Sequence, residues 1–188
     1  VYYLKSLARI VYHDLIKRGP KNTMFEKKIL SRKLFSPIDQ DLCLNGNGLL
    51  NSSVVVEKQL LIKSKYLSEN PKLIGAEDFE LWLKISKNTE NFYRINKALG
   101  YYWMDGNNLT NPLTTNVWAN ELIKLKVCNI NKKPPFWVIF ALAKSYYKLG
   151  DYKNCSKTLK FMKNNVYFIG KIEKLKLLIL MMLNIYFK

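Results

Sequence analysis

Residues 75–85, with the sequence GAEDFELWLKI, decide the fold of the central part of this chain. Phe79, Trp82 and Leu83 recur at spacings of three and four, and this pattern predicts an amphipathic helix that begins near Glu77. Two acids, Glu77 and Asp78, open this helix. The free backbone N–H groups and the dipole at a helix N-terminus stabilise carboxylates. The segment therefore predicts an ionised acidic pair at the start of a helix.

The segments on both sides of this helix have the pattern of strands. Upstream, residues 52–56 form a β-branched run that predicts a core strand, and residues 57–65 predict a helix. Downstream, residues 92–95 and 99–103 alternate like two short strands. Residues 1–12 have the pattern of a helix end that runs into a short buried strand. Strands and helices that alternate in this way predict an α/β fold for residues 1–113.

Residues 114–188 have a helical pattern only. Pro134-Pro135 is expected to open one helix, Gly150 to end it, and Asp151 to cap the next. The string YYKLGDY at residues 146–152 resembles one tetratricopeptide-like helical hairpin. A single repeat cannot bury both of its faces. We therefore expect residues 114–188 to be an all-α extension that packs on the α/β part.

The chain carries a formal net charge of +17. From residue 120 onward it has 14 basic and 3 acidic side chains, whereas the preceding residues have 17 basic and 11 acidic ones. This balance favours anionic partners such as nucleotide phosphates or anionic lipid headgroups. Nearly all of the excess is Lys, which lacks the planar fork of Arg, so no specific reading of nucleic acid is indicated. An AT-rich genome would produce the same Lys excess.

The cysteines and the single histidine indicate neither a zinc site nor an oxidising compartment. Cys43, Cys128 and Cys155 are far apart, no CxxC occurs, and His13 is the one histidine. Free thiols fit a reducing cytoplasm, and no signal-peptide pattern is visible. The longest apolar run, which begins at Leu177, is too short to cross a bilayer. The expectation is a cytoplasmic protein.

The central segment in its context resembles a known enzyme family. The motif Glu-Asp-aromatic-acid-Leu-Trp-Leu follows a Ser-Ser-Val run and precedes YWMDGNNLT at residues 102–110. This order is similar to the second half of the catalytic domain of family-two glycosyltransferases, which have a GT-A fold. The resemblance covers about residues 1–112. It implies a truncated GT-A (Rossmann-like) domain, because the nucleotide-binding amino-terminal half and its Asp-X-Asp motif do not appear in the sequence.

The resemblance also implies roles for individual residues. An inverting transferase needs a carboxylate that takes the proton of the acceptor hydroxyl, and the resemblance assigns this role to Asp78. Two acids that open an amphipathic helix are, however, often no more than residues compatible with the helix dipole. The residues implied to bind substrate are Glu77, Ser52, Ser53 and Trp82.

The family has a later turn that often carries a His ligand for the divalent cation of the donor. Asp105 occupies this position here, and a carboxylate can ligate Mg²⁺ or Mn²⁺. A turn-forming Asp-Gly is the more frequent meaning of such a pair. His13 is interpreted as structural.

The function implied by the resemblance is transfer of a sugar from a nucleotide-sugar donor to a glycan or lipid-linked acceptor, in polysaccharide synthesis of the bacterial cell envelope. The fragment alone is expected to be inactive. Lys171, Lys174 and Lys176 beside leucines could lie peripherally on the anionic inner face of the plasma membrane, although a buried bundle helix would have the same pattern. The alternative function is a non-catalytic, basic helical interaction module that binds an acidic protein or nucleic acid.

Overall fold

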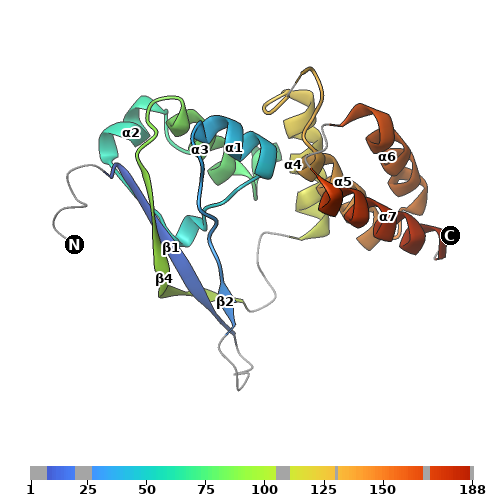
Figure 1. Cartoon of the computed structure of the whole chain (residues 1–188), viewed down its shortest axis with the longest axis horizontal. Coiled ribbons are helices and arrows are strands. Elements are labelled where there is room, and N and C mark those ends of the chain that lie inside the picture. The colour runs from blue at the N-terminus through green and yellow to red at the C-terminus, as the bar shows by residue number, and fades with distance from the viewer. Residues whose placement is uncertain (1–7, 20–26, 105–110, 130, 167–169, 187–188) are drawn as a thin grey trace. The chain divides into compact units, whose positions relative to one another are not determined.

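The computed structural model describes residues 8–19, 27–104, 111–129, 131–166 and 170–186 (Figure 1). These residues form two compact units. The first unit contains the chain up to residue 68 together with residues 77–108, and the second contains residues 69–76 and 109–188. The expected boundary lay at 113/114. Residues 69–76, which were expected in the first part, instead belong to the second unit.

The described part of the first unit contains a four-stranded mixed sheet around β1 (Ile10–Arg18). β4 (Phe92–Trp103) runs parallel to β1 along its whole length. The short strands β2 (Lys28–Ile29) and β3 (Val55–Val56) both pair antiparallel with β1, at Leu15–Ile16 and at Ile10–Val11. Since β4 occupies one edge of β1, the two short strands share its other edge.

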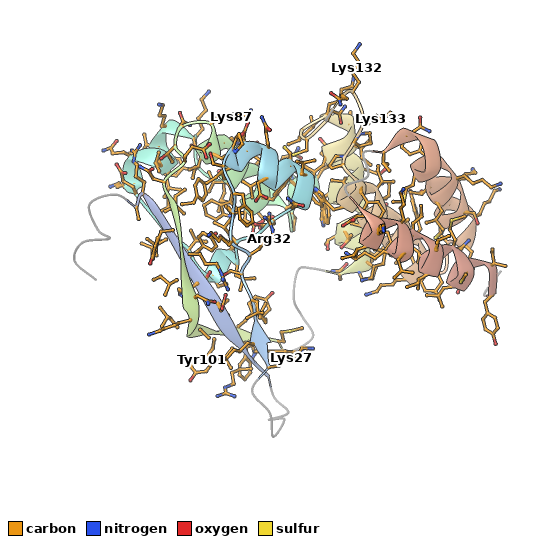
Figure 2. All side chains as sticks on the ribbon, viewed as in Figure 1. Lys27, Arg32, Lys87, Tyr101, Lys132 and Lys133 are labelled. Carbon is orange, nitrogen blue, oxygen red and sulfur yellow. The ribbon has the colours of Figure 1, made fainter. Side chains whose placement is uncertain are left out.

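β4 is one strand where two short strands were predicted. The pairing between β1 and β4 shifts register between His13 and Leu15, where extra residues of β4 bulge out. A bulge interrupts side-chain alternation without ending the strand. This interruption explains why the sequence pattern looked like two segments. Tyr101 and Lys27 mark the far end of the sheet in Figure 2, and there the Arg18 guanidinium lies 5.0 Å from the centroid of the Tyr101 ring.

The predicted core strand at residues 52–56 is wrong in most of its length. Residues Asn51–Ser53 form a 3₁₀ turn, η2, and only Val55–Val56 form a strand. Ser53 Oγ donates to the carbonyl of Leu50 at 2.7 Å and accepts from the backbone N–H of His13 at 3.3 Å. These bonds favour a turn over an extended chain. Val55 is 71% exposed, so the β-branched run lies at a sheet edge.

A buried polar cluster joins β1, β4 and the segment after β2. The Asp14 carboxylate accepts from the backbone N–H and the hydroxyl of Ser31, at 2.9 and 2.7 Å. Arg94 Nη2 donates to both carboxylate oxygens, at 2.9 and 3.1 Å, and Arg94 Nε donates to Ser31 Oγ at 2.9 Å. The cluster provides hydrogen-bond donors for the carboxylate of Asp14, a residue that is only 3% exposed.

Three α-helices complete the first unit as far as its residues are described. They are α1 (Ile38–Asn45), α2 (Lys58–Lys63) and α3 (Glu77–Ser86). The predicted helices near Glu77 and within residues 57–65 are therefore confirmed. α3 packs against α1 and buries one large apolar face, formed by Phe79, Leu81, Trp82, Leu83 and Ile85.

The second unit is helical, as predicted. It contains the 3₁₀ turn η3 (Pro71–Leu73) and the helices α4 (Pro112–Lys124), α5 (Phe136–Lys148), α6 (Tyr152–Asn165) and α7 (Lys171–Tyr186). Pro135 precedes α5, Gly150 has φ 77° after its end, and Asp151 caps α6 by accepting from the Asn154 N–H at 3.1 Å. The core lies between α5, α6 and α7. It contains Phe136, Ile139, Ala143, Cys155, Leu159, Met162, Val166, Leu177 and Leu180.

Within the residues that the structure describes, no helix has both the length and the apolar character needed to cross a membrane.

Candidate catalytic carboxylate at the start of α3

Asp78 lies in the first turn of α3, where its side chain is half-buried. Its Oδ1 accepts from the backbone N–H of Phe79 at 2.7 Å. Its Oδ2 accepts from Asn47 Nδ2 at 3.1 Å. Both oxygens of the carboxylate are therefore held, one by its own helix and one by a side chain 31 positions earlier in the sequence.

The end of α1 brings Asn47 to Asp78. Gly46 follows the last residue of α1 with φ 75°, and its N–H donates to the carbonyl of Leu42 at 2.9 Å. Glycine adopts this backbone conformation without the steric cost that a Cβ imposes. Asn47 Oδ1 then accepts from the Leu49 N–H at 3.0 Å, which fixes the orientation of the amide. The amide N–H of Asn47 consequently faces the carboxylate.

The surroundings of Asp78 raise its pKa above the usual value for an aspartate. Burial is the main cause, and the charge of Glu77 adds to it, while the bonds from Phe79 and Asn47 act in the opposite direction. The sequence predicted that the helix start would favour the charged carboxylate. That prediction is wrong in its net direction, because the loss of hydration outweighs the stabilisation by the helix. An ionised carboxylate with a raised pKa is a stronger base.

The other predicted substrate-binding residues have different environments. Glu77 is half-buried beside Asp78 in the first turn of α3, and Ser52 is exposed on η2. Ser53 is 2% exposed and its hydroxyl bonds to backbone groups. Trp82 is 3% exposed, and its Nε1 is buried without a hydrogen-bond partner in the described part of the chain. Of these four residues, Glu77 and Ser52 have side chains that solvent reaches.

The predicted metal ligand, Asp105, lies outside the described residues. Among the residues that the structure describes, no group of three or more His, Cys, Asp and Glu side chains could hold a metal ion. His13 Nδ1 lies 2.7 Å from the carbonyl oxygen of Asp14. This contact within the sheet agrees with the structural role expected of His13.

Asn47 was not among the predicted site residues. It lies in the polar, glycine-rich stretch Asn45-Gly46-Asn47-Gly48. Its two glycines were the available signal, because glycines that flank a polar residue often mark a tight turn that presents a side chain. That this side chain meets Asp78 depends on how α1 packs against α3.

The expectation of free thiols holds for one cysteine. Cys155 is a free thiol, fully buried in the core of the second unit, and burial raises its pKa to about 11. The expectation is wrong for Cys43 and Cys128, neither of which is a free thiol.

No protein-family model, curated protein or solved structure matches this chain. The resemblance to family-two glycosyltransferases consequently depends on the sequence motifs alone.

Proposed function

We propose that the first unit is the carboxyl-terminal part of a GT-A domain and that the protein is an inverting glycosyltransferase. Its substrates are a nucleotide-sugar donor and a glycan or lipid-linked acceptor, in bacterial cell-envelope polysaccharide synthesis. The Asp78 carboxylate takes the proton of the acceptor hydroxyl while the hydroxyl oxygen bonds to the anomeric carbon. The bond from that carbon to the nucleoside diphosphate breaks, and the diphosphate leaves with the electron pair.

The observation that carries the proposal is the environment of Asp78. The carboxylate is half-buried, is oriented through both oxygens, and has a raised pKa. A base needs a fixed position and a pKa closer to the operating pH than that of a solvated aspartate. An acidic residue that serves only to complement a helix dipole needs neither burial nor a partner from another element.

The neighbours of Asp78 have distinct roles in this proposal. Asn47 orients Oδ2, and Glu77 raises the affinity of Asp78 for a proton. Ser52 is exposed and available to a substrate, whereas Ser53 is occupied by backbone groups. Trp82 is buried in the core, and this burial anchors α3, the helix that carries Asp78. Its role is positioning, in contrast to the predicted contact with substrate.

A divalent cation, Mg²⁺ or Mn²⁺, is proposed as a component of the complete enzyme, where it stabilises the leaving diphosphate. The described residues do not form a site that fits it. The chemistry proposed for this chain is therefore limited to orienting the acceptor and removing its proton. By the same proposal, sugar transfer also requires a nucleotide-binding half.

The test is a transfer assay on the complete enzyme with Asp78→Asn, using a panel of nucleotide sugars. General base catalysis contributes about 10²–10⁴-fold, so transfer should fall by at least about 10²-fold while the affinity for the donor stays unchanged. Asp39→Asn is the matched control, because Asp39 is likewise an aspartate in the first turn of a helix, α1. Turnover of Asp78→Asn equal to that of Asp39→Asn would remove Asp78 from the base role.

The second candidate function is a non-catalytic interaction module, and the second unit is the observation that favours it. Its α5–α6 hairpin resembles a tetratricopeptide repeat, and residues 120–188 have 14 basic against 3 acidic side chains. Such a surface suits an acidic protein or a nucleic-acid backbone. Absence of sugar transfer by the wild type, together with tight, salt-sensitive binding of an acidic polypeptide, would favour this function.

Localisation is proposed as cytoplasmic, with peripheral contact between the second unit and the inner face of the plasma membrane. Lys171, Lys174 and Lys176 of α7 support that contact through their attraction to anionic lipid.

A further inference from the structure

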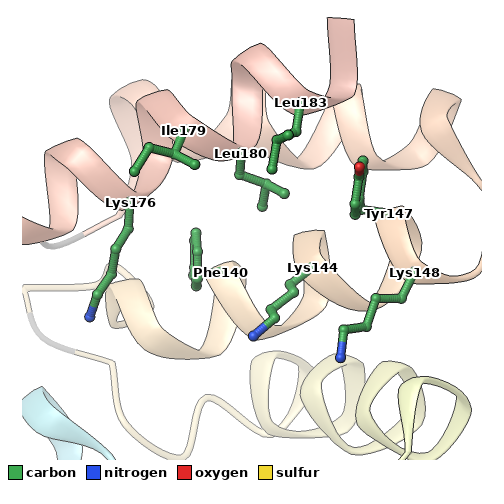
Figure 3. A pocket seen from close by; sticks show the side chains of 8 residues that line it. All are labelled: Phe140, Lys144, Tyr147, Lys148, Lys176, Ile179, Leu180 and Leu183. Carbon is green, nitrogen blue, oxygen red and sulfur yellow. The ribbon is translucent and has the colours of Figure 1, made fainter. Parts of the chain in front are cut away.

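An apolar groove runs between α5 and α7 in the second unit (Figure 3). Its volume is about 260 Å³. Ile179, Leu180 and Leu183 line it from α7, and Phe140 and Tyr147 line it from α5. Ile179 is 48% exposed and Leu183 is 40% exposed, so the groove is open to solvent. A soluble helical bundle normally covers such side chains, and their exposure indicates room for an apolar ligand.

Three lysines, Lys144, Lys148 and Lys176, also line the groove, and its lining includes no acidic residue. All three are exposed. In Figure 3 the Lys144 and Lys148 side chains extend from α5 and the Lys176 side chain extends from α7, and their Nζ atoms are directed away from Ile179, Leu180 and Leu183. Lysines commonly lay the methylene stem on apolar surface and keep the ammonium in water. The groove therefore combines an apolar floor with a positively charged margin.

The length and the lining of the groove favour one kind of occupant. On α7 the lining extends from Lys176 to Leu183, seven residue steps, which is about 11 Å at 1.5 Å per residue. An apolar groove of this length with a margin of lysines suits a single alkyl chain that carries an anionic head.

Other apolar residues of α7 are also open to solvent. Leu175, Leu178, Met182 and Ile185 are each more than half exposed, at 57, 52, 67 and 73%. Apolar surface is therefore available on α7 outside the lining of the groove. The margin of lysines complements a negative head on an alkyl chain that lies in the groove.

We propose that the α5–α7 groove binds an anionic lipid, with one alkyl chain between the two helices and a phosphate head at Lys144, Lys148 and Lys176. The site is distinct from Asp78, and the proposal does not depend on sugar transfer. It assigns the second unit a specific lipid-binding function, which goes beyond general attraction to a charged membrane surface.

The test uses the 188-residue chain and octyl phosphate below its micelle concentration, with binding measured by equilibrium dialysis at low ionic strength. We expect one molecule to bind per chain, at least tenfold more tightly than octyl glucoside. The affinity for octyl phosphate should fall at least tenfold in the triple variant Lys144→Gln/Lys148→Gln/Lys176→Gln, and the affinity for octyl glucoside should not change. The matched control, Lys153→Gln/Lys157→Gln/Lys160→Gln, removes three exposed lysines of α6 and should change the affinity by less than about twofold.

Two further variants separate this proposal from folding and from catalysis. Leu183→Asp places a charge on the groove wall and should lower the affinity for both octyl ligands, while the circular dichroism spectrum stays that of the wild type. Asp78→Asn should bind octyl phosphate normally, whether or not it transfers sugar.

Several results would overturn the proposal. Equal losses in the two triple-lysine variants would mean a non-specific charge effect. Inorganic phosphate that competes at the same concentration as octyl phosphate would mean a free-anion site. Dilution-dependent dimers that disappear with Leu183→Asp, without binding of octyl phosphate, would mean that a second copy of the chain covers the groove.

Discussion

Removal of the Asp14 carboxylate provides the sharpest test of how the sheet is held together. The side chain of Asp14 is 5% exposed and that of Arg94 is 19% exposed, so both charges lie largely out of water. Asp14→Ala leaves Arg94 Nη2 and the two Ser31 donors without their acceptor. Breaking a buried ion pair from one side typically costs about 3–5 kcal/mol. Because Arg94 keeps partial contact with solvent, we expect a loss of about 3 kcal/mol.

The loss should appear in urea unfolding of the first unit. With a denaturant slope of about 2 kcal/mol per molar, 3 kcal/mol lowers the urea midpoint by about 1.5 M. A Trp118→Phe/Trp137→Phe background leaves Trp82 and Trp103, both in the first unit, as the fluorescent probes. Each variant is measured in that background.

A double-mutant cycle tests the mechanism. Arg94→Met in combination with Asp14→Ala removes both charges, and the double variant should be at least about 1 kcal/mol more stable than the sum of the single losses predicts. As a control, Glu57→Ala removes an exposed carboxylate that bonds Arg9 on the surface, and it should leave the midpoint unchanged. Additive losses in the cycle, or a loss below about 1 kcal/mol for Asp14→Ala, would refute the cluster as a major source of stability.

The same cluster predicts a dependence on pH. Burial raises the pKa of Asp14, but the bonds from Ser31 and Arg94 outweigh it, and the net pKa lies below the ordinary value of 3.8. A lowered pKa contributes stability that is fully present above the unfolded value and is lost as the pH falls through the folded value. The difference between the wild type and Asp14→Ala should therefore be constant at neutral pH and shrink below about pH 3.8.

Three further predictions concern Asp78 and the core of the second unit. Asp78→Asn should raise the free energy of unfolding at pH 7, because a carboxylate whose pKa is raised by folding destabilises the folded state when it is ionised. This gain in stability should vanish below the unfolded pKa of 3.8, where the carboxyl group is protonated in both states. A loss of stability at pH 7 would contradict the burial of that charge. Cys155, with a pKa of about 11, should not react with a thiol reagent at pH 8 until urea unfolds the second unit, so rapid labelling of the native chain would disprove its burial. Met162→Ala should cost about 2–5 kcal/mol by creating a cavity among buried side chains, as measured by urea unfolding of the second unit. Met182→Ala, at a residue that is 67% exposed, should have little effect in the same measurement.

The sequence predicted the helices better than the sheet because helix signals are local. The apolar spacing of residues 75–85, Pro135 before α5, Gly150 after it and the Asp151 cap each act within a few residues. Strand signals depend on partners elsewhere in the chain. The Val55–Val56 run pairs with β1 through two residues only and lies at an edge of the sheet. No property of the run itself contains that information.

The sequence by itself determined that acids open α3 and that a helical, lysine-rich unit follows the α/β part. Only the tertiary structure decided what those features mean physically. Asn47 reaches Asp78 because α1 ends in a turn beside α3, and burial then reverses the expected direction of the Asp78 pKa. Likewise, the apolar residues of α7 form a groove with lysines only where α5 packs beside it. Hydration and proximity depend on residues distant in sequence, and for this reason local patterns cannot predict them.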